Sequence, residues 1–208
     1  MVLLLETVNN GGITPVFLYF QREMFKNILF LVLALVFLLC LVYLLKDHTF
    51  DRSRLWNTRA YKKHLSSIIK KFLLGALMII LLVLVIDKEL FLSLPRQRPG
   101  IWLMVMVIYP VVSVYPQEII FRTFLFQRYQ TIFKEETLIR MSGFSFGIAH
   151  LFYGNLIAPV LSALGGFLFA GTYQKTRSTF FAAFEHALWG DLIFTVGWGW
   201  YFYSSAIP

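Results

Sequence analysis

Three ionisable side chains lie within apolar stretches of the sequence, where a lipid bilayer disfavours their charge. They are Glu118 in Tyr115-Pro-Gln-Glu-Ile-Ile-Phe-Arg122, His150 in Phe146-Gly-Ile-Ala-His150, and His186 in Phe184-Glu-His-Ala187. A charge at the centre of a bilayer costs about 2.5 to 3.5 kcal/mol on insertion scales, so intramembrane acids and histidines usually mark functional sites. One carboxylate and two imidazoles can accept and return protons, and together they could activate a water molecule. We therefore expect these residues to perform chemistry within a membrane.

The remainder of the sequence is apolar enough to place these residues in a bilayer. Of the 208 residues, 58% are hydrophobic and 14% are charged, and the mean hydropathy is +0.69. A soluble domain usually has about 25% charged residues. Residues 27–45 have no polar face and approach the roughly 20 residues that cross a bilayer as a helix. The composition therefore predicts an all-α, polytopic membrane protein and excludes an unusually apolar soluble domain.

Hydropathy and charge predict six transmembrane helices, at residues 27–45, 72–94, 101–128, 138–153, 156–173 and 179–203. Pro110 and Pro116 interrupt the third segment. We predict this segment either as one kinked helix or as two helices broken near Pro116, which would make seven. Residues 1–26 are interpreted as an N-terminal segment that lies at the membrane interface or extends the first span. Residues 27–208 are interpreted as a single transmembrane domain.

The net charge of +8 comes from basic residues that flank the predicted spans, many of them in a polar loop at residues 46–71. With this loop in the cytoplasm, thirteen lysines and arginines lie inside and four lie outside, in agreement with the positive-inside rule. Both termini are then outside. Basic residues beside membrane spans suit topology signals and anionic lipid headgroups better than nucleic acid. We expect a multi-pass protein of the cell membrane whose partners include membrane lipid and exclude nucleic acid.

The three candidate residues are predicted to lie at similar depths in the membrane. At 1.5 Å per helical residue, Glu118 lies about 15 Å from the inner end of its helix, His150 about 18 Å and His186 about 10 Å. The helix boundaries follow from hydropathy and charge alone, so this agreement is independent of the site. It favours one shared site on three different helices.

Polar neighbours accompany each candidate. Glu118 and Arg122 are four residues apart and share one face of a helix, where they can form an ion pair. Gln117 precedes Glu118 and offers both amide donors and an acceptor. The ion pair of Glu118 and Arg122 could also have a purely structural role in joining two helices.

The two histidines have neighbours of their own. Phe146 and His150 are also four residues apart on one helix face. Glu185 precedes His186, and Asp191 follows it by just over one helical turn. Either carboxylate could orient an imidazole through its ring N–H or could bond to a neighbouring helix, and the spacing leaves both alternatives open.

Small residues predict close helix packing around the site. Gly143 and Gly147 are four residues apart, and Ser162, Gly166 and Ala170 continue the same spacing on the next predicted helix. This pattern lets transmembrane helices approach closely. We expect it to pack the helix before His150 against its neighbours inside the protein.

The motifs Gln117-Glu-Ile-Ile-Phe-Arg122 and Phe146-Gly-Ile-Ala-His150, followed by His186, resemble the CPBP family in their order and spacing. This family comprises CAAX proteases and bacteriocin-processing membrane proteins, and its pattern is Glu-Glu-x-x-x-Arg, Phe-x-x-x-His and His-x-x-x-Asn. The resemblance covers residues 101–203. It implies an intramembrane endopeptidase that uses a glutamate, needs no cofactor, and cleaves a protein or peptide, with or without an attached lipid.

The resemblance also implies roles for individual residues. In the family, a glutamate and the histidine of Phe-x-x-x-His activate water, while the last histidine and the asparagine stabilise the oxyanion of the tetrahedral intermediate. Carried over to this sequence, Glu118 is the base, His150 is its partner and His186 is the oxyanion or orienting group. Arg122 and Phe146 match the family pattern and are expected to support the site.

Two positions depart from the family pattern. Gln117 stands where the family has its first glutamate, and Gly190 stands where it has asparagine. Glutamine cannot act as a base. Either Glu118 takes this role, with Asp191 or Glu185 assisting, or the protein has lost catalysis and uses the fold to hold a peptide or a lipid.

A metal-dependent site is a further alternative. Glu118, His150 and His186 could provide three zinc ligands around an open coordination position. The sequence contains no His-Glu-x-x-His pair, and the family resemblance implies a site without metal. Zinc is therefore the less favoured interpretation.

Overall fold

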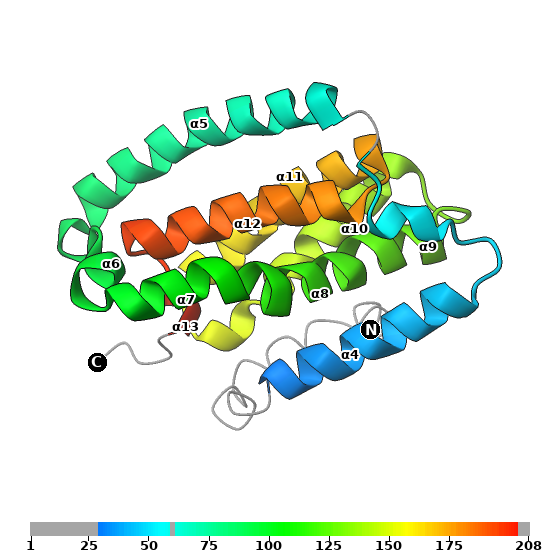
Figure 1. Cartoon of the computed structure of the whole chain (residues 1–208), viewed down its shortest axis with the longest axis horizontal. Coiled ribbons are helices and arrows are strands. Elements are labelled where there is room, and N and C mark those ends of the chain that lie inside the picture. The colour runs from blue at the N-terminus through cyan, green and yellow to red at the C-terminus, as the bar shows by residue number, and fades with distance from the viewer. Residues whose placement is uncertain (1–28, 59–60, 204–208) are drawn as a thin grey trace.

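The computed structural model describes residues 29–58 and 61–203, and most of these residues are helical (Figure 1). No strand occurs within these two ranges. The prediction of an all-α polytopic membrane protein is therefore confirmed. The predicted interfacial segment at residues 1–26 lies outside the described residues.

Within the described ranges, four helices are long and apolar enough to cross a membrane, over Leu29–Lys46, His64–Ile86, Pro99–Tyr129 and Ile157–Thr176. They correspond to four of the six predicted spans. The other two predicted spans correspond to α10 (Glu135–Ile148) and α12 (Thr179–Val196). Between α4 (Leu29–Lys46) and α5 (Tyr61–Ile86) lies η1 (Arg52–Leu55), and η2 (Lys88–Leu90) and α6 (Ser93–Gln97) follow α5. The short helix η5 (Leu151–Tyr153) precedes α11 (Ile157–Thr176), and α13 (Trp200–Tyr203) follows α12.

Residues Pro99–Tyr129 form one continuous helix, so the alternative of two helices broken near Pro116 is wrong. The helix comprises α7 (Pro99–Tyr109), α8 (Tyr115–Glu118) and α9 (Leu125–Tyr129), joined by π-helical stretches η3 (Pro110–Val114) and η4 (Ile119–Phe124). Pro110 and Pro116 lack the N–H that an α-helix needs at each position. A wider π turn accommodates such a defect without breaking the helix, and π turns occur frequently at functional sites.

The polar loop predicted at residues 46–71 is shorter than expected, because α5 begins at Tyr61. Lys70 and Lys71 therefore lie on a helix rather than in a loop. The basic side chains of this region interrupt the apolar pattern, so hydropathy alone placed the start of the span about three turns too late.

The loop that follows α4 is bound to the end of α9. The side-chain amide of Gln127 donates to Asp47 Oδ2 at 2.9 Å and to Thr49 Oγ1 at 3.0 Å. The hydrogen bonds from Gln127 and then from Thr49 hold the pKa of Asp47 below its usual value. This anchor fixes one end of the long helix that contains Glu118.

Helices α4 and α5 lie on opposite sides of the remaining helices (Figure 1). Cys40 and Leu44 of α4 pack in a buried cluster with Ile119 of η4. On the other side, Val83 of α5 packs against Ile193 of α12. The outer faces expose large apolar side chains that suit contact with lipid tails, such as those of Leu31, Leu73 and Val85.

The polar residues of the interior are positioned by close contact between α10 and α11. A Cβ atom added to Gly166 would lie 2.8 Å from the Cα atom of Gly143, a separation that real side chains do not adopt. The prediction that small residues pack these helices inside the protein is therefore confirmed. This contact places the end of α10, with His150, beside the helix that contains Glu118.

Candidate active site

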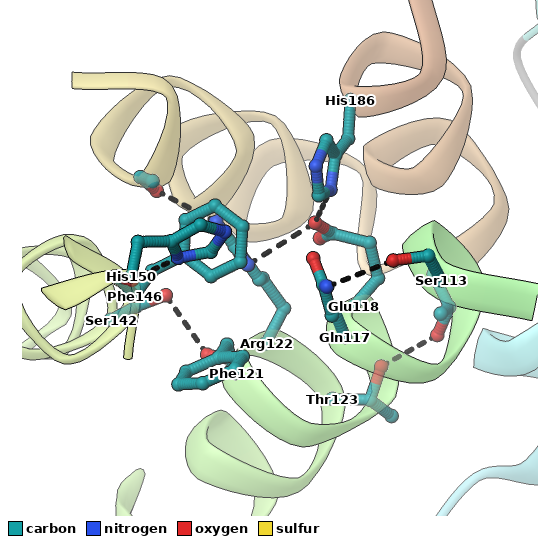
Figure 2. A network of polar contacts seen from close by, with 12 residues as sticks. Ser113, Gln117, Glu118, Phe121, Arg122, Thr123, Ser142, Phe146, His150 and His186 are labelled. Atoms are coloured by element: carbon teal, nitrogen blue, oxygen red, sulfur yellow. Dashed lines mark hydrogen bonds and ion pairs between the residues drawn. The ribbon is translucent and has the colours of Figure 1, made fainter. Parts of the chain in front are cut away.

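Glu118 lies at the centre of a buried polar network. Its Oε1 atom is 2.8 Å from His186 Nδ1 and 3.1 Å from Arg122 Nη1. The Glu118 and Arg122 side chains have no exposed surface, and His186 is buried. Figure 2 shows the Glu118 carboxylate between the imidazole of His186 and the guanidinium of Arg122. The predicted pairing of Glu118 with Arg122 is thus present, and His186 of α12 also contacts the Glu118 carboxylate.

Glu118 determines which ring nitrogen of His186 carries the proton. A carboxylate only accepts hydrogen bonds, so His186 Nδ1 donates to Glu118 and Nε2 retains its lone pair. This arrangement is that of the acid–histidine pairs in which the acid orients an imidazole that acts as a base. A base at Nε2 could take a proton from water or from a nucleophile.

His150 lies just beyond the end of α10 rather than within a long span. Its Nδ1 atom is 2.7 Å from the carbonyl oxygen of Phe146, one of the carbonyls that lack a partner at a helix end. Because a carbonyl only accepts, Nδ1 donates and Nε2 retains its lone pair. The four-residue spacing of Phe146 and His150 therefore forms a local contact that holds the ring.

Aromatic rings surround the network and join the two histidines. The ring of Phe146 lies 4.6 Å from that of His150 and 5.3 Å from that of His186, measured between centroids. The ring of Phe169 stacks on His186 at 4.6 Å. The Arg122 guanidinium lies 4.4 Å from the centroid of the Phe146 ring. Phe146 therefore contacts both imidazoles and the cation that pairs with Glu118.

A cavity of about 1640 Å³ opens beside the network. His150, His186, Phe146 and Gln117 line it, whereas Glu118 is not among the lining residues. Glu118 is fully buried behind His186. The structure thus presents the two imidazoles to the cavity and keeps the acid away from it.

Gln117 occupies the position at which a carboxylate would face the cavity. Its amide nitrogen donates to Ser113 Oγ at 3.1 Å, one turn earlier (Figure 2). One N–H and the amide oxygen remain for other contacts. This residue can hold a polar group by hydrogen bonding and cannot take a proton.

Glu185 and Asp191, two further predicted residues, form no hydrogen bond to either imidazole among the described residues. Glu185 is fully buried, and it binds Lys71 Nζ of α5 at 2.5 Å and the hydroxyl of Thr172 on α11. Of the two roles left open for it, the structure shows the bond to neighbouring helices. Asp191 Oδ1 is buried without a hydrogen-bond partner among the described residues.

Tyr109 is a site residue that the sequence analysis missed. Its hydroxyl is 3.2 Å from His186 Nε2, and the residue lines the cavity. A tyrosine within an apolar span gives no signal by itself. The absence of a side chain at Gly190 was the available clue, because a Cβ atom there would overlap the hydroxyl of Tyr109.

The residues do not fit the zinc alternative. Within residues 29–58 and 61–203, no group of three or more His, Cys, Asp or Glu side chains is arranged to hold a metal ion. Glu118 and His186 direct their facing atoms at each other. These two atoms are therefore not placed to share a metal ion.

The fold and the site together define a polytopic membrane protein with an acid–histidine pair beside a cavity. Residues 99–190 match the family model described as Type II CAAX prenyl endopeptidase Rce1-like. The resemblance to CAAX proteases is thereby confirmed, and the match includes Glu118, His150 and His186. Over these residues the chain is similar to the CAAX prenyl endopeptidases that this family model describes. Comparison with curated proteins and with solved structures gives no match.

Proposed function

We propose that the protein is an intramembrane endopeptidase that hydrolyses a peptide bond inside the cavity, with His186 as the general base. The observation that supports this proposal most strongly is the position of His186. Its Nδ1 is held by Glu118 at 2.8 Å, and the residue lines the cavity. A positioned base of this kind accelerates proton transfer by about 10² to 10⁴.

The role of Glu118 in this proposal differs from the one that the family resemblance implies. Glu118 is fully buried and does not line the cavity, so a water molecule bound beside the substrate does not reach it directly. Glu118 instead orients His186 and stabilises the imidazolium that forms when Nε2 accepts a proton. Arg122 neutralises the carboxylate while His186 is uncharged.

The reaction proceeds in two steps. In the first step, a water proton moves to His186 Nε2, the water oxygen bonds to the peptide carbonyl carbon, and the carbonyl oxygen becomes negative. In the second step, the oxyanion collapses, the C–N bond breaks, and the proton on Nε2 moves to the departing nitrogen. The products are a peptide that ends in a carboxylic acid and an amine, and the site returns to its initial protonation state. The acid then passes its proton to the amine, which gives a carboxylate and an ammonium group.

His150 is the second residue that holds the water. Its Nδ1 is engaged by the Phe146 carbonyl at 2.7 Å, which leaves Nε2 as an acceptor. Accepting a hydrogen bond from the second proton of the water directs the attacking lone pair toward the carbonyl. The contact of both imidazoles with the Phe146 ring supports this arrangement.

The substrate proposed is a protein or peptide whose cleaved end lies within the membrane. Away from the histidines, apolar side chains line most of the cavity, including Leu74, Met78, Met104 and Leu168. Such a lining favours a peptide with an attached lipid chain, in agreement with the prenyl endopeptidase family. We further propose the cell membrane as the location.

Cleavage by reconstituted protein tests this function. Wild type in liposomes is incubated with a peptide ending in a farnesylated Cys-aliphatic-aliphatic-X sequence and with its unlipidated counterpart. We expect cleavage of the lipidated peptide, a loss of about 10² to 10⁴ in rate for His186→Ala, and no change for His48→Ala, whose side chain is exposed on a loop. Equal cleavage by wild type and His186→Ala would refute the proposal.

One observation favours a second candidate function, a binding protein without catalysis. The position that faces the cavity at the start of the acidic motif is an amide, Gln117, and the neighbouring acid is buried. Under this alternative the wild type binds the lipidated peptide and never cleaves it. The variant Gln117→Glu discriminates between the two functions, because only the non-catalytic alternative predicts that cleavage appears with this single substitution.

A further inference from the structure

Tyr109 brings a hydroxyl donor to the reacting atoms of the site. The residue ends α7, immediately before the π-helical stretch that begins at Pro110. Its hydroxyl is 3.2 Å from His186 Nε2, and both residues line the cavity. Since Nδ1 of the same ring donates to Glu118, Nε2 accepts, and the tyrosine hydroxyl is the donor.

The position of this hydroxyl depends on Gly190. A Cβ atom at residue 190 would overlap the hydroxyl and the ring carbons of Tyr109. The Tyr109 ring is also held edge-on by Phe194, at 5.3 Å between centroids. Gly190 and Phe194 lie one turn apart on α12, the helix that contains His186. The lack of a side chain at residue 190 thus provides the space through which a residue of α7 reaches His186.

Resting on the hydrolytic function proposed above, we infer that Tyr109 donates a hydrogen bond to the oxyanion that forms on the peptide carbonyl. The attacking water takes the place of the hydroxyl at His186 Nε2. The C–O bond of tyrosine allows the freed O–H to turn toward the carbonyl oxygen, whose carbon is attacked from the Nε2 side. Tyr109 is then a catalytic residue, because it touches the reacting atoms.

The other polar groups near Nε2 are less suited to this task. Arg122 and Glu118 do not line the cavity, and the Nδ1–H of His150 is held by a backbone carbonyl. Gln117 lines the cavity, but one of its two N–H groups is bound to Ser113. Tyr109 is the donor that the structure places in direct contact with the proposed base.

Tyr109→Phe tests the inference by removing one oxygen while keeping the ring that packs against Phe194. Loss of one oxyanion donor usually lowers kcat by about 10² to 10³. We expect this loss for cleavage of the farnesylated peptide, with an unchanged KM and an unchanged unfolding temperature. Tyr129→Phe, at the end of α9 and outside the cavity lining, is the matched control and should cleave as wild type does.

A binding measurement tests the role of Tyr109 without requiring cleavage. A farnesylated peptide with a phosphonate in place of the scissile amide has the tetrahedral shape and negative oxygen of the intermediate. Wild type should bind it more tightly than the amide peptide, and Tyr109→Phe should lose about 100-fold in phosphonate affinity while binding the amide equally well.

The outcomes separate this inference from the proposed function. If wild type cleaves and Tyr109→Phe cleaves at the same rate, the role of Tyr109 is refuted and the hydrolytic function stands. If wild type does not cleave, the proposed function fails, and the phosphonate measurement alone decides whether Tyr109 binds an oxyanion. Equal phosphonate affinity in wild type and Tyr109→Phe overturns the inference in either case.

Discussion

The buried pair of Glu118 and Arg122 should make the protein strongly sensitive to loss of the arginine. Arg122→Met keeps most of the side-chain volume but leaves the Glu118 carboxylate buried without its cation. Removing one partner of a buried ion pair costs about 3 to 5 kcal/mol. His186, at 2.8 Å from the same carboxylate oxygen, can take up a proton and partly replace the missing charge. We therefore expect the free energy of unfolding of Arg122→Met to fall by about 3 kcal/mol, the lower end of this range.

The double variant Glu118→Gln/Arg122→Met isolates the cause of this loss. Replacing both members of a buried pair often leaves stability unchanged, so the double variant should recover most of the 3 kcal/mol expected for Arg122→Met. Unfolding in detergent micelles can be followed by tryptophan fluorescence. As a control, Arg177→Met breaks a partly exposed pair with Glu135 and should cost less than about 1 kcal/mol. A double variant no more stable than Arg122→Met would refute the reasoning.

Three further predictions concern the framework of the site. Gly166→Val should force α11 away from Gly143, whose Cα atom lies 2.8 Å from the Cβ position, and should lower the unfolding temperature and the cleavage rate together. Lys71→Met should leave Glu185 buried without its cation and destabilise the protein by about 3 kcal/mol, which Lys71→Met/Glu185→Gln should largely restore in the same unfolding assay. The lowered pKa of Asp47 means that its contribution to stability is present above about pH 4, the ordinary aspartate range, and is lost as the pH falls below it. Limited proteolysis of the 47–58 loop should therefore accelerate at low pH, and a rate independent of pH would contradict this.

Much of the helical framework could be predicted because apolar runs in a membrane protein report directly on helices. The first span, predicted at 27–45, is α4 at Leu29–Lys46, and the fifth, predicted at 156–173, is α11 at Ile157–Thr176. The continuity of Pro99–Tyr129 could not be predicted. Whether two prolines break a helix or are absorbed by π turns depends on the packing of neighbouring helices, which is a tertiary property.

The convergence of Glu118 and His186 could be predicted only in part. Similar depth on different helices indicated one site, but depth does not specify which atoms meet. Glu118 is covered by His186, whereas its neighbour Gln117 lines the cavity. This difference depends on how the helix is rotated about its axis, because adjacent residues point in different directions from a helix. The contact of Tyr109 with His186 could not be predicted from periodicity or charge. It depends on the absence of a side chain at Gly190, which leaves room for the Tyr109 hydroxyl.

The central claim is that Glu118 acts by orienting His186, which in turn takes the proton from water. The most direct test is the single-turnover cleavage rate of the stable double variant Glu118→Gln/Arg122→Met, measured on the farnesylated peptide at saturating protein. Replacing the orienting acid of an acid–histidine pair by its amide lowers kcat by about 10⁴. We predict a loss of this order with peptide affinity unchanged. A cleavage rate within a few-fold of wild type would contradict the account.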